Sequence, residues 1–333
     1  MTESELDQTV DSIAAVQQDD GMIPWFPGGH TDPWNHVEAA MALDAGGRRA
    51  EAEAAYRWLV ATQRPDGAWH QYYRAGRVEE PTLDANVTAY VATGVWHHFL
   101  ATGDTGFLDT MWPTVAAAVG FVLDLQTPRG EIIWARHADG TPWSFALLTA
   151  SCSTFASLRS AQSVAARLGH ARPEWEPAVE RLGRVIVEQP GAFLPKDRWA
   201  MDWYYPVLTG AVTGDAACSR LADGYDRFVL EGLGVRCVAD KDWVTAAETA
   251  ECAMAHLAAG DVDTAALLLD WAGHLRQDDG SWFTGMVHPQ RHHFPAGELS
   301  TYSAAAVTLA ATALAGGGPL IPLLVPATAV GRR

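Results

Sequence analysis

The residues of this sequence that are best suited to chemistry are carboxylates, amides, histidines and aromatic rings near the starts of alanine-rich segments. Rings beside an acid suit a sugar, because its C–H faces stack on rings while its hydroxyls bond to acids and amides. The run from Trp199 to Tyr205 concentrates such rings around Asp202. The candidate site residues are Asp32, Trp34, His36, Glu38, Asp84, Asn86, Asp202, Trp203, Tyr204, Glu248, Glu251, His288 and Tyr302.

Three of these acids also have an ordinary structural interpretation as helix caps. Asp32 precedes Pro33, a pairing typical of a helix start, with Asp as the N-cap and Pro at the first helical position. Thr245 and Glu248 have the S/T-x-x-E spacing of a capping box, in which the glutamate bonds the Thr245 amide. We expect Asp84 to be a cap. Capping and chemistry are therefore alternative roles for these acids.

Glu38 and Glu251 are different, because each lies inside a segment of alanine and apolar residues, where an unpaired carboxylate is costly to bury. Either they are paired in the core or they face a funnel filled with water. His288 and its neighbouring histidines have no partner acid at the spacing of metal ligands on a helix, and their loop contains Pro and Gly. We therefore predict no metal site.

The helices that must position these residues are of two kinds. Segments in which apolar residues at helical spacing alternate with charged ones should have one wet face. They predict an outer ring at residues 50–62, 107–125, 174–188, 221–230 and 264–275. Segments that are small and apolar all round predict a buried inner ring at residues 34–43, 86–100, 145–168, 203–212, 246–258 and 301–314. An inner helix is wet only at its ends, so its first polar residues should face a funnel mouth.

A recurring turn links these segments. In it a glycine or proline ends one helix, a carboxylate caps the next, and an aromatic residue packs the turn onto the wall. Copies occur at residues 63–69, 277–282, 17–21 and, more loosely, 126–134, and further copies are expected at 195–199 and 240–243. The pattern predicts six helical hairpins and an all-α fold, the (α/α)6 barrel or six-hairpin toroid.

Length and composition favour one domain. The chain has 333 residues, and no linker rich in Ser, Gly or Pro interrupts its middle, so we expect a barrel over residues 1–315 followed by a C-terminal tail, 316–333. The N-terminus is acidic and lacks a secretory signal, and the apolar tail is cut by prolines and too short to span a bilayer. We expect a cytoplasmic protein without a membrane partner.

Charge and cysteine content narrow the partners further. The net charge of −17 repels nucleic-acid phosphates and anionic membranes, so we expect no nucleic-acid partner and a neutral or cationic small substrate. The 14 tryptophans exceed what a plain core requires. The four cysteines are scattered without a C-x-x-C pair, which predicts buried thiols in a reducing compartment and no disulfide framework. Oligomeric state is not predicted.

Motifs for several common chemistries are absent. The sequence has no G-x-G-x-x-G, Walker A, G-x-S-x-G or H-E-x-x-H, so we predict no cofactor. The Gln-x-x-x-Gly-x-Trp turn resembles the QW repeat of squalene cyclases and of protein-prenyltransferase toroids. However, the Asp-x-Asp-Asp proton donor of the cyclases and the Asp-x-Cys of the prenyltransferases are both missing. That resemblance therefore implies a fold and no chemistry.

Three longer stretches carry a second resemblance: DPWNHVEAAMAL at 32–43, ATGVWHH at 92–98 and KDRWAMDWYY at 196–205. Through them, and across nearly its whole length, the chain resembles an actinobacterial family of single toroids. Its mycobacterial members are endo-mannanases that cut methylmannose polysaccharides, which are intracellular chains of α-1,4-linked, partly methylated mannose. The resemblance implies a cytoplasmic, endo-acting glycoside hydrolase whose partner is a polysaccharide or oligosaccharide.

Such a reaction needs one acid to protonate the leaving oxygen and one carboxylate to activate water or attack the anomeric carbon. We predict Glu248 as general acid and Asp32 as general base, held on opposite inner helices, with Asp202 the next candidate. A real capping box at Glu248 would favour Glu251 instead. We predict an inverting reaction, stacking platforms at Trp34, Trp203, Tyr204 and Tyr302, and hydroxyl-binding groups at His36, Asp84, Asn86 and His288.

Two other functions fit the same residues. A terpene-cyclase-like or prenyl-binding toroid would use the aromatic faces to stabilise a carbocation, with a lone acid starting the reaction. A lectin-like module would bind mannan without cutting it. The length of the products formed from the polysaccharide separates these alternatives from the hydrolase.

Overall fold

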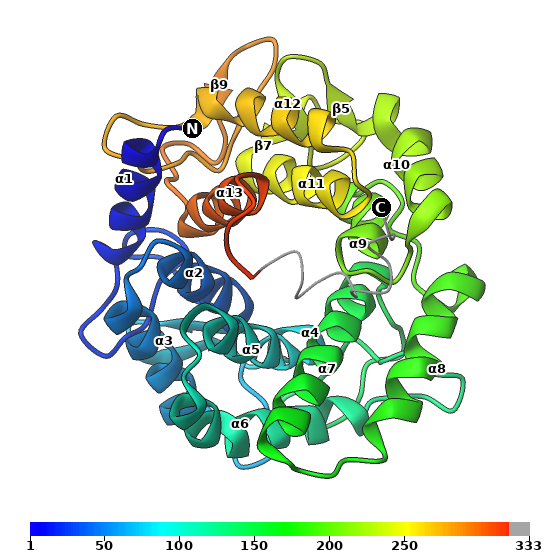
Figure 1. The fold of residues 1–333 in the computed structure, drawn as a ribbon. Helices are drawn as coiled ribbons and strands as arrows, with labels where there is room; N and C mark the ends of the chain where they lie inside the picture. The colour runs from blue at the N-terminus through cyan, green and yellow to red at the C-terminus, as the bar shows by residue number, and fades with distance from the viewer. Residues whose placement is uncertain (320–333) are drawn as a thin grey trace.

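Helices arranged as two concentric rings dominate the computed structural model, which describes residues 1–319 (Figure 1). The inner ring consists of α2 (Pro33–Ala45), α4 (Ala85–Ala89) with α5 (Val91–Thr102), α7 (Leu148–Leu168), α9 (Ala200–Leu208), α11 (Ala246–Ala258) and α13 (Thr301–Leu314). The outer ring consists of α1 (Glu3–Ala14), α3 (Arg49–Thr62), α6 (Thr105–Leu123), α8 (Trp175–Glu188), α10 (Gly214–Phe228) and α12 (Val262–Ala272).

The inner ring closes on itself. Each inner helix contacts the next one along the chain, and α13 packs against α2, so the last inner helix meets the first (Figure 1). The N-terminal helix α1 packs against both α13 and α2 and completes the outer ring at this seam. The predicted segments 246–258 and 301–314 coincide with α11 and α13, whereas α1 was not predicted and the segment 86–100 is divided into α4 and α5.

The chain is mostly helical, as the predicted all-α fold implies, but short strands that were not predicted occupy the loops. A hairpin joins β1 (Tyr72–Arg74) to β2 (Arg77–Glu80), and β3 (Leu83–Asp84) pairs with β4 (Ala135–Arg136). A five-stranded antiparallel sheet runs through β5 (Val229–Leu230), β6 (Gly234–Arg236), β7 (Trp243–Thr245), β8 (Gly285–Val287) and β9 (His292–His293). Strands of two to four residues are too short to show an alternating pattern in the sequence.

These strands anchor the starts of inner helices. Strand β3 ends at Asp84, immediately before α4, and β7 ends at Thr245, immediately before α11. Backbone hydrogen bonds of the ladders therefore fix the points at which two inner helices begin, and with them the side chains of the first helical turns.

The recurring glutamine acts in the same way in three of the turns. The Nε2 of Gln63 donates to the carbonyl oxygens of Gly67, in its own turn, and Thr114, in α6, at 2.9 Å each. Gln17 and Gln126 make the equivalent pairs of bonds to their own turns and to α3 and α8. Each side chain therefore ties a turn to the outer helix of the next hairpin.

The glycine of this turn is required by close packing. Gly67 has φ +88°, and a Cβ there would lie 2.2 Å from the carbonyl oxygen of Ala117. Gly280 has the same conformation against Gln8 of α1. The tryptophans that follow, Trp69 and Trp282, are buried, as predicted, and their indole N–H groups donate to Leu59 and Thr9.

Three of the four cysteines are buried, but Cys218 is exposed. Among the described residues α6 is the helix long and apolar enough to cross a membrane by length and composition, and it packs against α5 and α7. Residues 320–333 of the predicted tail lie outside the described part of the chain.

Candidate active site

A cavity of about 360 Å³ lies where the inner helices begin. Every helical hairpin contributes to its wall, because α2, α4, α7, α9, α11 and α13 each supply at least one residue. Its lining residues are Trp25, Asp32, Trp34, Asn35, Gln71, Tyr72, Asn86, Val87, Thr149, Trp199, Met201, Tyr205, Cys237, Glu248 and Tyr302. The expectation that the starts of the inner helices converge on one hollow is therefore met.

Asp32 is both a helix cap and a wall residue of this cavity. Its side chain accepts a 2.8 Å hydrogen bond from the Asn35 amide at the start of α2 and a second bond from the Asn35 side chain. It is only 4% exposed, and this burial raises the pKa of its carboxyl group to about 6. Capping and chemistry are thus compatible at Asp32, because a carboxylate with this pKa is still largely ionised at pH 7.

Glu248 lies in the first turn of α11, 8% exposed, on the same cavity. The Thr245 hydroxyl donates to its carboxylate, and the Thr245 side chain makes no capping bond, so the arrangement is not the reciprocal capping box. Cys237 lies beside it, and burial together with the Glu248 charge raises the pKa of that thiol. Helices α2 and α11 both pack against α13. The prediction that they lie opposite each other is therefore wrong.

Three buried polar atoms of the lining residues have no hydrogen-bond partner among the described residues. They are the indole Nε1 of Trp25, the Oδ1 of Asn35 and the Oδ1 of Asn86. Buried polar groups are normally paired, and an unpaired one costs roughly 1–3 kcal/mol. One donor and two acceptors on the lining residues are therefore left for a partner that the described residues do not supply, such as the hydroxyl groups of a ligand.

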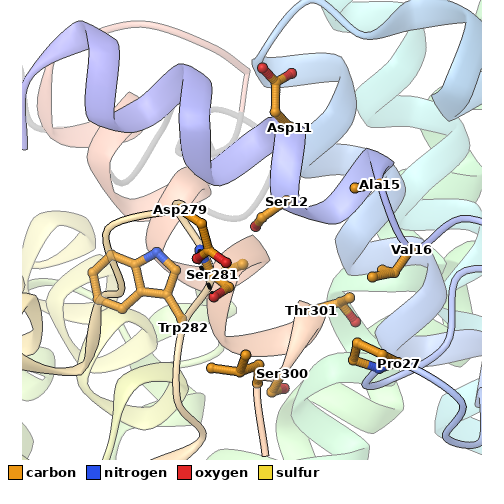
Figure 2. A pocket seen from close by; sticks show the side chains of 12 residues that line it. Asp11, Ser12, Ala15, Val16, Pro27, Asp279, Ser281, Trp282, Ser300 and Thr301 are labelled. Atoms are coloured by element: carbon orange, nitrogen blue, oxygen red, sulfur yellow. Dashed lines mark hydrogen bonds between the residues drawn. The ribbon is translucent and has the colours of Figure 1, made fainter.

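A second hollow, of about 390 Å³, provides a contrast (Figure 2). It lies at the seam between α1 and the loops around Trp282 and Ser300, and its hydroxyl groups are used within the protein. Ser12 donates to Thr9, Ser281 to Asp279, and Thr301 to Pro24. No predicted site residue lines this hollow, and it offers a ligand no orphaned polar atom from the described lining residues.

Aromatic rings lie both in the wall of the cavity and at its rim. Trp34 stacks on Tyr90 with ring centroids 4.5 Å apart and meets the edge of Tyr302 at 5.5 Å. Trp199 is 42% exposed and lines the cavity at its rim, with the Lys196 ammonium 5.8 Å from its ring. Trp34 and Tyr302 occupy the predicted position, whereas Trp199 was predicted only to pack a turn onto the wall and not to contact the substrate.

Asp202 and Trp203 do not line the cavity, which corrects their prediction as site residues. The Thr149 hydroxyl, on the cavity wall, donates to Asp202 at 2.6 Å, so this acid lies behind the wall. The Trp203 indole donates to the Arg220 carbonyl and stacks on Phe228. Helix α9 directs these two residues outward to α10, a choice of face that the composition of the segment did not reveal.

Two histidines and a tyrosine are also displaced from the predicted site. Both ring nitrogens of His36 are used, with Nδ1 bonded to the Ile23 amide and Nε2 to the Ala55 carbonyl. His288 follows β8 and lies edge-on to His274, away from the cavity. Tyr204 is fully buried. His36 therefore serves backbone hydrogen bonding, His288 packs against His274, and Tyr204 donates its hydroxyl to Glu251 in the core.

Asp84, Glu38 and Glu251 lie close behind the wall. Asp84 caps α4 by accepting bonds from the Asn86 and Val87 amides, as expected of a cap. Glu38 and Glu251 are 3% and 1% exposed and border a void of about 20 Å³ that also touches Trp34 and Tyr205. Each is hydrogen-bonded to tyrosine hydroxyls in the core, which is one of the two alternatives left open by the sequence. Neither lines the cavity.

Burial of Glu38 should make stability depend on pH. Burial raises the pKa of its carboxyl to about 7 from 4.5, so the folded protein keeps a proton that the unfolded chain releases. Its stabilising contribution is complete below pH 4.5 and is lost as the pH rises through 7. We expect the unfolding free energy of wild type to fall by about 3 kcal/mol relative to Glu38→Gln between pH 4.5 and 8. Urea unfolding of both proteins across this pH range measures the difference in unfolding free energy. A difference that does not change with pH would contradict the prediction.

Several lining residues were missed by sequence reasoning. Trp25, Gln71 and Tyr72 lie in loops or at the start of the β1–β2 hairpin, and Thr149 and Val87 carry no charge that would single them out. Asn35 was overlooked although it lies between two predicted residues, Trp34 and His36. Among the described residues no cluster of three or more His, Cys, Asp or Glu side chains could hold a metal ion.

Comparison with solved structures places the fold. A wild-type glycosidase aligns with a TM-score of 0.75 over 97% of this chain and 98% of its own, at 15% identity. A D-mannose isomerase aligns with a TM-score of 0.67 over 92% of this chain and 96% of its own, at 10% identity. No protein-family model matches the sequence. The protein is thus mostly helical and shares its fold with these structures.

A relative in sequence narrows this class. The MMP endo-(1,4)-3-O-methyl-alpha-D-mannosidase of Mycolicibacterium hassiacum is 50% identical over 314 residues, which cover 94% of this chain and 87% of that protein. The chain belongs to the family of this mannosidase, and the family resemblance noted in the sequence is confirmed.

Proposed function

We propose that this protein is an endo-acting glycoside hydrolase that cleaves α-1,4-mannosidic bonds in a polysaccharide of partly O-methylated mannose. The name of its relative supplies the reaction and the bond. The observation that carries the proposal is the shared cavity of Asp32 and Glu248, two buried acids surrounded by orphaned polar atoms and aromatic rings. Two carboxyl groups on one sugar-sized hollow are what glycoside hydrolysis requires.

In this proposal Glu248 protonates the leaving oxygen and Asp32 activates the attacking water, with inversion at the anomeric carbon. The raised pKa of Asp32 supports the role of base, since a base works best when its pKa lies near the working pH. Glu248 lies on the cavity in the first turn of α11, and its carboxylate accepts a hydrogen bond from the Thr245 hydroxyl. Comparing the anomeric form of the first product with that of the substrate tests inversion.

The composition of the wall supports a methylated substrate. Val87 and Met201 place apolar groups on the cavity beside the polar atoms of Asn35 and Asn86. An apolar contact accepts a methoxy group, which a purely polar wall would reject because its own groups would lose their partners. The mixed wall therefore fits a sugar chain that carries both hydroxyl and methoxy groups.

The remaining predictions complete the proposal. The double ring forms a single (α/α)6 barrel domain over residues 1–315, and the protein acts in the cytoplasm on a polysaccharide or oligosaccharide. Six inner positions, one of them shared by α4 and α5, contact each other in sequence among the described residues and support the barrel. The net charge of −17 supports the absence of nucleic-acid and anionic-membrane partners.

Incubation of the purified protein with methylmannose polysaccharide tests the function. Resolving product lengths over time should show a rapid fall in mean length with intermediate oligomers, the result expected of an endo cut. Unchanged length with tight binding would identify a lectin and contradict the hydrolase. Unchanged length without binding would favour a prenyl-binding toroid and contradict it as well.

Trp199 provides a test of the cavity rim. Its exposed ring is placed to stack on a sugar, an interaction worth about 0.5–1.5 kcal/mol beyond the area buried. We expect Trp199→Ala to raise KM for the polysaccharide about three- to tenfold. Leu194→Ala is the matched control, because Leu194 is also 42% exposed and does not line the cavity. Equal KM values for both variants would remove Trp199 from the binding surface.

A further inference from the structure

Glu251 is the centre of a hydrogen-bond cluster beneath the cavity. It lies one helical turn after Glu248 on α11, and its carboxylate accepts bonds from three tyrosine hydroxyls. Tyr302 donates at 2.6 Å, Tyr205 donates at 3.0 Å, and Tyr204 also donates. The donors come from α9 and α13, so one carboxylate links three inner helices.

Two of these three tyrosines reach the cavity. Tyr205 and Tyr302 line it, whereas Tyr204 is fully buried and does not. A phenol whose hydroxyl is held by a buried carboxylate loses freedom at that end, so its ring is fixed where it contacts a ligand. Glu251 is therefore connected to the substrate cavity through Tyr205 and Tyr302.

Glu38 makes a similar connection from α2. It accepts a 2.5 Å bond from the Tyr90 hydroxyl, and Tyr90 stacks on Trp34, which lines the cavity. Glu38 and Glu251 border the same void, whose volume of about 20 Å³ is enough to hold a single water molecule. The two acids thus form one cluster below the cavity.

The cluster contains no positive charge to balance two carboxylates. Burial, and next the charge of Glu38, raise the pKa of Glu251 to about 8. The titratable described residues that interact with the pair are all acidic or neutral: Tyr56, Tyr90, Tyr204, Tyr205, Cys237, Glu248, Cys252 and Tyr302. The three phenolic donors are therefore the groups that hold the Glu251 carboxyl group in the core.

We propose that Glu251 is a positioning residue, which fixes the Tyr205 and Tyr302 rings of the cavity and acts on the sugar only through them. This inference rests on the proposed hydrolase function. It replaces the sequence-based roles of Glu251 as sugar ligand or alternative acid, because three phenols and the core, not the cavity, surround its carboxyl group. A residue that acts through another should lose its effect when that other residue is altered.

A double-mutant cycle on cleavage tests this inference. We expect Glu251→Gln to lower kcat/KM about tenfold or more, and Tyr205→Phe with Tyr302→Phe to do the same. Adding Glu251→Gln to the two phenylalanine substitutions should then lower it less than twofold further. Additive losses would overturn the proposal, because they would mean that Glu251 acts independently of the two rings.

Tyr204→Phe is the matched control. It removes a hydroxyl bonded to the same carboxylate but away from the cavity, so it should change the unfolding midpoint without changing kcat/KM more than twofold. If Tyr204→Phe lowers cleavage as much as Tyr302→Phe, the cluster has a general structural role and the inference is wrong. If wild type cleaves the polysaccharide and Glu251→Gln cleaves it equally well, the inference alone is contradicted. If wild type does not cleave the polysaccharide, the proposed function is contradicted as well.

Discussion

Replacing Glu248 with glutamine is expected to lower kcat about a thousandfold. The amide keeps the size of the side chain and can still accept the Thr245 hydroxyl, but it has no proton to give to the leaving oxygen. Losses of about 10²- to 10⁴-fold are typical when a general acid is removed. The variant should still bind the polysaccharide, because the other lining residues of the cavity are unchanged.

The measurement is the rate of chain shortening, with the affinity and the unfolding midpoint determined on the same protein. Glu176→Gln serves as control, since Glu176 also lies in the first turn of a helix, α8, but is exposed on the outer ring. The control should cleave at the wild-type rate. Turnover within a few-fold of wild type in Glu248→Gln would show that another residue supplies the proton.

Asp32→Asn should have an effect of similar size for a different reason. The asparagine oxygen can still accept the Asn35 amide, so the cap of α2 is retained and the cost in stability should stay below about 1 kcal/mol. The negative charge that activates water is removed, and kcat should fall about 10³-fold. In wild type, kcat/KM should fall as the pH drops through about 6, because protonation of Asp32 removes the base.

Asp104→Asn is the matched variant for this test. Asp104 caps α6 by accepting the Phe107 amide at 3.0 Å, so the same substitution is made at a cap on the outer ring. It should leave cleavage unchanged. An active Asp32→Asn variant with an unchanged acidic limb would exclude Asp32 as the base and leave it as a cap only.

Much of the ring architecture could be predicted because its signals are local. The glutamine, glycine and tryptophan of a turn lie within seven residues, and each acts on a neighbouring helix, as Gln63 and Gly67 do. The inner helices were visible because they are apolar all round. The strands were not predicted, since their pairing depends on distant segments such as β7 and β8, and α1 was missed because its apolar stripe is narrow.

The sequence predicted that the site lies at the starts of the inner helices. It did not predict which residues of each helix face the cavity. Asp32 and Glu248 lie in the first turns of inner helices, and the structure brings them to one cavity. Trp203 and Tyr204 are also near a helix start, yet successive residues on a helix point about 100° apart, so they face α10 and the core. Only three-dimensional packing decides which of Met201, Asp202 and Tyr205 meets the cavity.

The residues supplied by loops were beyond sequence reasoning for another reason. Trp25 and Tyr72 reach the cavity because their loops fold back across the ring, where the Thr31 and Tyr73 backbones pair. No periodic pattern marks such a residue in advance. Trp199 was expected to pack a turn onto the wall, but its ring remains exposed at the rim of the cavity.

The most direct test of the central claim is a crystal structure of the Glu248→Gln variant with a bound α-1,4-linked, methylated mannose oligosaccharide. We predict that the chain crosses the cavity with one glycosidic oxygen beside position 248 and the adjoining anomeric carbon facing Asp32, within reach of one water. Sugar bound elsewhere, or bound in the cavity with Asp32 and position 248 both remote from every glycosidic bond, would contradict the account.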